Sequence, residues 1–262
     1  MEIAFAVVSL TAIGAFCAVL LAVASKIMAV KVDERSEEIL NAFPNSNCGA
    51  CGFPGCAGYA AALLSGDEKN ISLCTPGGQE TIQKLSLILG VEAVESIRKF
   101  AAVHCGAVDN DKERKMNYSG IKSCLAAYEF FGGDFSCSYG CLGYGDCVRL
   151  CPNGAICAEN GLAVIDTELC NGCTLCMKAC PVKLIKIYDE EVKVQVACNN
   201  RERGAVVRNK CTKCCLGCGK CMRECPEAAI TVENNLAKID YSKCTFCNHC
   251  VTICVNKCIK NI

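Results

Sequence analysis

Residues 211–226 read CTKCCLGCGKCMRECP and residues 244–254 read CTFCNHCVTIC, and these two cysteine-rich runs decide the fold. Each contains a Cys-x2-Cys-x2-Cys-x3-Cys pattern. Cysteines this close in sequence are poor disulfide partners for one another but suitable metal ligands. The pattern is typical of a pair of [4Fe–4S] clusters, in which the fourth cysteine of each run binds the cluster of the other run.

The end of the chain therefore predicts two clusters in one small domain. We expect one cluster on Cys215, Cys218, Cys221 and Cys254, and the other on Cys225, Cys244, Cys247 and Cys250. Between the runs, AITVENNLAKID alternates apolar and polar residues around Asn-Asn, which predicts a β-hairpin. This arrangement resembles the compact α+β unit of two-cluster bacterial ferredoxins. Cys214 is expected to be a non-ligand.

The preceding part of the chain repeats this unit. Shifting the sequence by 74 residues superimposes nine pairs of cysteines and aligns GAICAENGLAVID (154–166) with AAITVENNLAKID (228–240). One regular ligand set in the first unit is Cys151, Cys170, Cys173 and Cys176. In the other set Tyr144 stands where the second unit has Cys218. We therefore assign Cys137, Cys141, Cys147 and Cys180, with Cys124 as the reserve candidate.

A separate group of cysteines lies nearer the N-terminus, in CGACGFPGCAGYA and the later CTPGG. Its members are Cys48, Cys51, Cys56 and Cys74. The intervening glycines allow the backbone to wrap closely around a cofactor. Four cysteines also suit zinc, but the runs downstream favour a [4Fe–4S] cluster. Residues 57–64 and 79–103 are expected to be helical, which predicts a small helical domain.

The first residues differ from the rest of the chain. Ile3 to Ala24 is uncharged and long enough to cross a bilayer as a helix. A cleaved signal peptide is the competing interpretation, but the segment lacks a basic beginning. Lys26, Lys31 and Arg35 follow it, so the positive-inside rule predicts a single-pass anchor with its N-terminus outside and the remainder in the cytoplasm.

These features predict an α+β protein with the following organisation. The ranges are a transmembrane anchor (1–30), a juxtamembrane linker (31–43), an N-terminal 4Fe-4S domain (44–105), a solvated linker (106–123), and ferredoxin-like units at 124–197 and 198–262.

The composition of the chain limits the classes of function that it can have. The 262 residues include 28 cysteines, and thiolates that await metal require a reducing compartment. The net charge is zero, so nothing in the overall charge points to nucleic acid. The sequence carries no nucleotide-binding fingerprint beside the cysteines. Five clusters on one chain therefore predict an electron carrier that leaves substrate chemistry to partner subunits.

The order of the N-terminal span, CGACGFPGCAGYA, CTPGG, CSYGCLGYGDCVRLCPNGAI and the ferredoxin runs is similar to the B subunit of the Rnf electron-transport complex, in its long form typical of anaerobes. The resemblance covers nearly the whole chain. It implies a membrane enzyme complex, an ion-translocating ferredoxin:NAD⁺ oxidoreductase of the inner cytoplasmic membrane. This chain would accept electrons from reduced ferredoxin and pass them to membrane and NAD-binding partner subunits. It departs from the usual pattern at Val255, where proline is the expected residue after the cysteine.

Two other functions remain open. The alternatives are an electron-wire subunit of another membrane enzyme such as a hydrogenase, and a zinc-binding or thiol-storage protein with no redox role. Seven basic residues between 199 and 223 are our hypothesis for the surface that docks an acidic ferredoxin: Arg201, Arg203, Arg208, Lys210, Lys213, Lys220 and Arg223. The sequence also leaves open whether Cys105, Cys124, Cys198 and Cys211 bind a sixth cluster or include a structural thiol pair.

Overall fold

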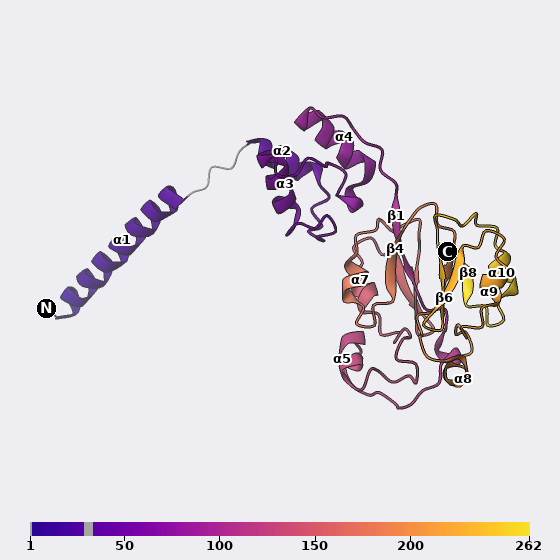
Figure 1. Cartoon of the computed structure of the whole chain (residues 1–262). Helices are drawn as coiled ribbons and strands as arrows, with labels where there is room; N and C mark the ends of the chain where they lie inside the picture. The colour runs from indigo at the N-terminus through magenta and orange to yellow at the C-terminus, as the bar shows by residue number, and fades with distance from the viewer. Residues whose placement is uncertain (1, 29–33) are drawn as a thin grey trace.

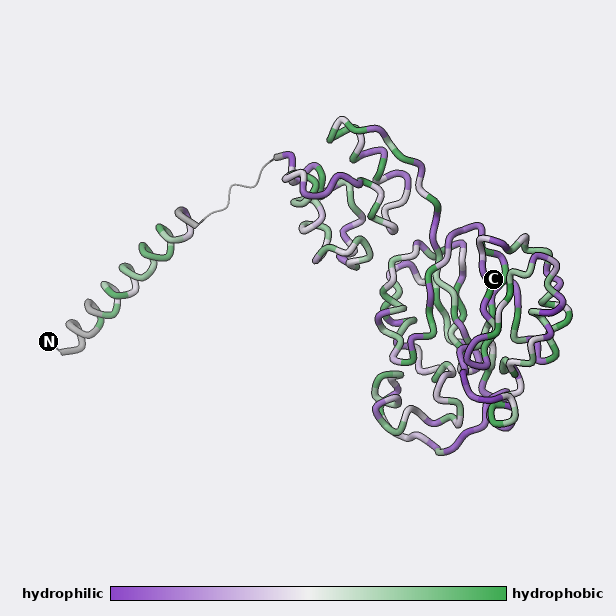
Figure 2. The backbone as a smooth tube through the Cα atoms, in the orientation of Figure 1, coloured by the Kyte–Doolittle hydropathy of each residue, from purple (hydrophilic) through white to green (hydrophobic). Residues whose placement is uncertain are grey.

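The computed structural model describes residues 2–28 and 34–262 (Figure 1). Helix α1 runs from Glu2 to Met28, and its coloured length is mostly hydrophobic in Figure 2. Among the described residues, no helix is long and apolar enough to cross a membrane. The anchor predicted over residues 1–30, parts of which lie outside the described residues, stays a prediction.

A small helical domain follows α1. It consists of α2 (Glu34–Ala42), α3 (Cys56–Ser65), a 3-10 turn (Thr75–Gly77) and α4 (Gly78–Leu89). Its core contains Ile39, Tyr59, Leu63, Ile82 and Leu85, all buried. The apolar faces of three short helices close on one another. The sequence predicts two of these helices, α3 and α4, but the juxtamembrane linker predicted over residues 31–43 is wrong for α2, which packs into this core through Ile39. The small helical domain is therefore confirmed.

The helix predicted over residues 79–103 is correct as far as Leu89 and wrong beyond it. Gly90 adopts a left-handed conformation (φ 69°) and ends α4. Strand β1 (Lys99–Val103) then pairs with β4 (Ile185–Asp189) in antiparallel register. The apolar run around Phe100 fits both the periodicity of a helix and that of a strand. Pairing with a strand of the first ferredoxin-like unit makes it a strand. β1 thus packs with the unit that follows.

The second ferredoxin-like unit consists of two small antiparallel sheets and short helices. The outer sheet pairs β5 (Val194–Val196) with β8 (Ile259–Asn261), and the hairpin pairs β6 (Ile230–Glu233) with β7 (Leu236–Ile239). α9 (Lys220–Arg223) and α10 (His249–Ile253) lie within the two cysteine runs; α8 (Gly204–Val207) precedes them. Asn234 and Asn235 both have positive φ, as a two-residue hairpin turn requires. The predicted hairpin is confirmed.

The first unit has the same architecture. β2 (Ile156–Glu159) and β3 (Leu162–Ile165) form its hairpin, while β1 and β4 form its outer sheet. Its helices are α6 (Asp146–Arg149) and α7 (Leu175–Ala179). The two outer sheets correspond residue by residue: Val103 pairs with Ile185, as Val196 pairs with Ile259.

An insertion within the first unit distinguishes it from the second. Cys105 lies two residues after β1, and Cys198 lies two residues after β5. Cys137 is 32 residues beyond Cys105, whereas Cys211 is 13 beyond Cys198, so the first unit carries 19 additional residues. The ungapped shift that pairs Cys124 with Cys198 therefore misses the structural counterpart of Cys198, which is Cys105. The insertion includes α5 (Cys124–Glu129) and follows a 3-10 turn at Asp109–Asp111.

The linker predicted over residues 106–123 is not wholly solvated. Lys112 is buried, and its backbone forms a β-bridge with Cys211 of the second unit. The two units also meet at His104, whose Nδ1 donates to the carbonyl of Val196 (3.0 Å). The His104 Nε2 then accepts from the Tyr188 hydroxyl (2.7 Å). Burial, followed by the nearby Lys186 charge, lowers the pKa of His104 to about 4, so the ring is neutral at neutral pH.

Candidate iron–sulfur sites

The two cysteine runs of the second unit form two separate cavities. One is lined by Cys215, Cys218, Cys221 and Cys254 and the other by Cys225, Cys244, Cys247 and Cys250. In both, the fourth cysteine comes from the other run, as the ferredoxin spacing predicts. Gly217, with φ 64°, passes so close to the Asn235 backbone that a side chain would not fit beside the first cavity.

Two further thiols line the first of these cavities without belonging to its predicted ligand set. Cys258 lies 3.5 Å from the sulfur of Cys254, and hydrogen bonding from it lowers the pKa of Cys254 to about 5. The same thiol lowers the pKa of Cys215 to about 6. Cys214 is fully buried, and its sulfur accepts from the Asn256 amide (3.5 Å). These contacts give Cys214 and Cys258 structural partners of their own.

The regular site of the first unit is assembled beneath β1. Burial, followed by the charges of Cys170, Cys173 and Cys151, raises the pKa of Cys176 to about 12. The backbone N–H of Ala101 donates to the Cys170 sulfur (3.3 Å). The four cysteines are therefore close neighbours, as predicted.

The irregular site of the first unit contains Cys124, which the sequence gave only as the reserve candidate. Burial, followed by the charges of Cys141, Cys124 and Cys180, raises the pKa of Cys147 to about 12. Cys124 begins α5, which is held beside α6 because Asp146 accepts from the backbone N–H of Leu125 (3.0 Å). The insertion thus brings Cys124 close to Cys147 and Cys180.

Cys137 has different neighbours. Its sulfur accepts from the Asn200 amide (3.3 Å), and it lines a third cavity with Cys105, Cys198 and Cys211. Sequence reasoning assigned Cys137 to the irregular site because the spacing within the run was the only guide. The repeat partner of Cys137, Cys211, was the sequence feature that pointed to a different role.

The N-terminal domain brings together its four predicted cysteines. Burial, followed by the charges of Cys56, Cys48 and Cys51, raises the pKa of Cys74 to about 11. The Asn47 side chain accepts from the backbone N–H of Cys56 (2.9 Å) and fixes the start of α3. Three left-handed glycines, Gly49, Gly52 and Gly55, permit the turns between these cysteines.

This domain contacts the regular site of the first unit. Lys178 on α7 donates from its Nζ to the carbonyl of Cys48 (2.6 Å). The charge of Cys48 also contributes to raising the pKa of Cys173, after burial. The N-terminal cysteines and the Cys151 set are therefore adjacent.

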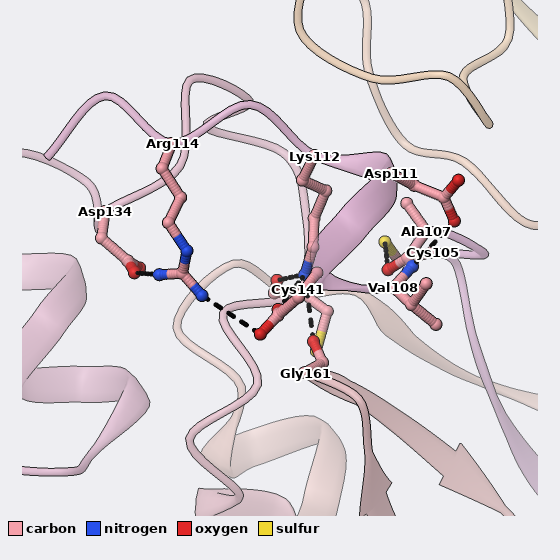
Figure 3. Close-up of polar contacts among 10 residues, drawn as sticks. Cys105, Ala107, Val108, Asp111, Lys112, Arg114, Asp134, Cys141 and Gly161 are labelled. Atoms are coloured by element: carbon pink, nitrogen blue, oxygen red, sulfur yellow. Dashed lines mark hydrogen bonds and ion pairs between the residues drawn. The ribbon is translucent and has the colours of Figure 1, made fainter. Parts of the chain in front are cut away.

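A buried lysine holds the insertion against the irregular site (Figure 3). Lys112 Nζ donates to the carbonyls of Cys141 (2.8 Å) and Gly161 (3.0 Å) and lies 4.1 Å from the Phe135 ring centroid. Asp109 lies 3.6 Å from the same nitrogen. Asp109 and the buried Asp134 both pair with Arg114, which ties the two ends of the insertion together.

The donor sets fit [4Fe–4S] clusters. Each cavity or group offers four cysteine sulfurs, and backbone N–H donors point at several of them, including Leu184 to Cys180 (3.4 Å). Such N–H donors stabilise thiolate charge and raise cluster potentials. Among the described residues, no group of three or more His, Cys, Asp or Glu side chains is placed to hold a single metal ion.

Family models match three segments of the chain. The FeS model, for an Fe-S cluster, matches residues 43–76; a 4Fe-4S binding domain matches 163–186; a 4Fe-4S dicluster domain matches 209–255. These segments contain the N-terminal cysteine group, the Cys170 run and the two runs of the second unit. The prediction of several [4Fe–4S] binding domains is confirmed.

Curated relatives cover most of the chain. The B subunit of the Na(+)-translocating ferredoxin:NAD(+) oxidoreductase complex of Acetobacterium woodii is 42% identical over 91% of this chain and 72% of its own length. The proton-translocating counterpart of Clostridium ljungdahlii is 37% identical over 97% and 91%. The B subunit of the ion-translocating oxidoreductase complex of Methanosarcina acetivorans is 35% identical over 96% and 95%.

The chain belongs to this B-subunit family. The resemblance to the Rnf B subunit is thereby confirmed, and with it the assignment to an oxidoreductase complex. The second unit brings together two regular cysteine sets. The first brings the regular set of Cys176 together and places Cys124 of the insertion near Cys147.

Proposed function

We propose that this chain is the membrane-anchored iron–sulfur subunit that takes electrons from a reduced ferredoxin and passes them to partner subunits of an ion-pumping ferredoxin:NAD⁺ oxidoreductase. The observation that carries the proposal is the succession of cysteine groups through the described structure, on a chain of the B-subunit family. When bound, the clusters supply one-electron transfer.

The residues that hold these clusters fall into five sets. They are Cys48, Cys51, Cys56 and Cys74; Cys151, Cys170, Cys173 and Cys176; Cys124, Cys141, Cys147 and Cys180; Cys215, Cys218, Cys221 and Cys254; and Cys225, Cys244, Cys247 and Cys250. Cys124 replaces Cys137 in the third set because its charge acts on both Cys147 and Cys180.

The donor docks on the second unit. Cys218 is exposed, and Arg223 on the following helix donates to its carbonyl (3.2 Å). Exposed Arg201, Arg203 and Arg208 lie in the same unit, whereas Lys210 is paired with Glu202 (2.6 Å). A basic surface beside an exposed cluster ligand suits an acidic electron carrier, because opposite charges steer the encounter.

The opposite end of the described structure faces the membrane partners. The N-terminal domain follows α1 in the chain and contacts the first unit through Lys178. The sequence supports a single-pass anchor at residues 1–30, because the 22 residues from Ile3 to Ala24 are uncharged and the basic residues after them would lie on the cytoplasmic side. Large side chains described in α1, including Leu10, Phe16 and Leu21, are exposed and available to lipid.

The test uses inverted membrane vesicles from cells with and without the chain. We expect NADH formation from reduced ferredoxin to require the chain and to return when it is supplied in full length. If vesicles without the chain lost hydrogen evolution and kept NADH formation, the chain would instead belong to a hydrogenase. Stoichiometric zinc and a featureless EPR spectrum of the dithionite-reduced protein would refute electron transfer.

A further inference from the structure

We infer that Cys105, Cys137, Cys198 and Cys211 hold an additional [4Fe–4S] cluster between the two ferredoxin-like units. The inference rests on the proposed function for the type of cofactor, but its evidence is the geometry of a cavity outside the five sets. That cavity is lined by all four of these cysteines.

The four cysteines form two pairs of structural counterparts, and each pair has one member in each unit. Cys105 and Cys198 each follow the first strand of their unit by two residues. The residue before each makes the same backbone bond: His104 N–H to Leu184 (2.8 Å) and Ala197 N–H to Cys258 (2.7 Å). Cys105 and Cys198 are thus structural counterparts, a relation hidden in the sequence by the 19-residue insertion.

The second pair precedes the cysteine runs. Cys137 and Cys211 each lie four residues before the first cysteine of the run, at Cys141 and Cys215. Each unit therefore contributes one cysteine after its first strand and one before its first run. The cavity is therefore lined by the same two positions of both units.

Backbone bonds hold these segments together. Glu113 N–H donates to Lys210 (3.0 Å), while the Glu113 carbonyl accepts from Ser136 (2.8 Å). One extended residue of the insertion therefore joins the segment ending at Cys211 to the segment ending at Cys137. A side-chain bond, from His104 Nδ1 to the Val196 carbonyl (3.0 Å), joins the segments that carry Cys105 and Cys198.

The surroundings suit a cluster better than four inert core thiols. Cys105, Cys137 and Cys211 are buried, and two donors reach sulfurs of the set: Asn200 to Cys137 (3.3 Å) and the Cys215 N–H to Cys198 (3.3 Å). All four cysteines are free of disulfides. Buried polar donors directed at sulfur stabilise the thiolate form that cluster ligation requires. Cys137 is available because Cys124 serves the irregular site.

This position gives the additional site a specific place. Gly140 and Cys214, which precede Cys141 and Cys215, line the same cavity, and the Cys215 N–H donates to the Cys198 sulfur (3.3 Å). Cys141 belongs to the first unit and Cys215 to the second. The additional set therefore lies between the cysteine groups of the two units and joins them into one succession.

The test counts clusters on the purified, anaerobically prepared full-length chain by native mass spectrometry and by iron and sulfide analysis. We expect the most highly occupied species of the wild type to hold six clusters, and that of Cys211→Ser and Cys105→Ser to hold five. Cys214→Ser is the matched control, because Cys214 is a buried thiol in the same cavity and should leave six.

A maximum of five clusters in both the wild type and Cys211→Ser would overturn the inference while leaving the proposed function intact. Absence of all iron would instead refute the proposed function. Asn200→Leu guards against a folding artefact, because it keeps all four ligands. It should retain six clusters and lower the reduction potential of one in an EPR-monitored titration, since the donor to Cys137 is lost. Five clusters or unchanged potentials in this variant would argue against the site.

Discussion

The two ferredoxin-like units share their sheets, registers and helices, yet they complete one cluster site in different ways. The second unit takes all of its ligands from two regular runs, with Cys218 in the middle of the first run. The first unit has Tyr144 at that position and brings Cys124 from an insertion instead. On the ligand sets proposed above, Cys124 therefore takes in the first unit the role that Cys218 has in the second.

The insertion explains how this exchange is tolerated. Lys112 donates to the carbonyls of Cys141 and Gly161, and Asp146 fixes the helix that carries Cys124. Tyr144 packs edge-on against Tyr118 of the insertion, with ring centroids 5.7 Å apart. Tyr144 thus helps to hold the inserted segment that carries Cys124.

The largest expected effect is removal of iron and sulfide, which should unfold both units. Their strands are three to five residues long and their cores consist partly of ligand cysteines, so cluster binding supplies much of the folding free energy, on the order of 10 kcal/mol per structural metal site. Chelation at mildly acidic pH, followed by circular dichroism and NMR at neutral pH, measures this. A first unit that stays folded alone would show that its insertion stabilises it independently.

The next effect is a ligand exchange that tests the comparison directly. Cys124→Ala should remove the iron of one cluster, and adding Tyr144→Cys should restore it, because the second unit uses a cysteine at this position. Iron and sulfide analysis measures both. Cys157→Ala, an exposed cysteine on β2, is the control and should change nothing. Iron loss in Cys137→Ala that Tyr144→Cys repairs would instead return Cys137 to the irregular site.

A smaller effect is expected from charge reversal on the second unit. Replacing Arg201, Arg203 and Arg208 by Glu should raise the KM for reduced ferredoxin roughly tenfold, about 1.4 kcal/mol, and weaken its salt dependence. Steady-state kinetics of the whole complex at several ionic strengths measure this. Reversal of Lys69, Lys84 and Lys122, which lie outside the second unit, makes the same charge change and should leave the KM unaltered.

The smallest effect concerns the contact between the N-terminal domain and the first unit. Lys178→Met removes one hydrogen bond to the Cys48 carbonyl, worth about 1 kcal/mol. We expect a modest decrease in the reoxidation rate of the N-terminal cluster within the complex, with no loss of iron. Lys69→Met, an exposed lysine of the same domain, should have no effect. Equal rates in the two variants would show that this hydrogen bond does not set the relative placement of the domains.

Local spacing made most of the fold and the regular sites predictable. A Cys-x2-Cys-x2-Cys-x3-Cys run fixes three ligands within a short loop, and the Asn-Asn turn fixes a hairpin, because both depend on neighbouring residues. The prediction of a helix beyond Leu89 was wrong because the apolar residues around β1 fit a helix as well as a strand. Only the pairing with β4 decides between the two.

The sequence by itself determined the family and the duplicated unit, and it predicted the grouping of the cysteines outside the irregular site, since each depends on a spacing that survives in the chain. Tertiary structure alone decided that Cys124 lies beside Cys147 and Cys180, and that Cys105 is the counterpart of Cys198. The reason is physical: both relations cross the 19-residue insertion, and only packing and backbone pairing between distant segments bring those sulfurs together.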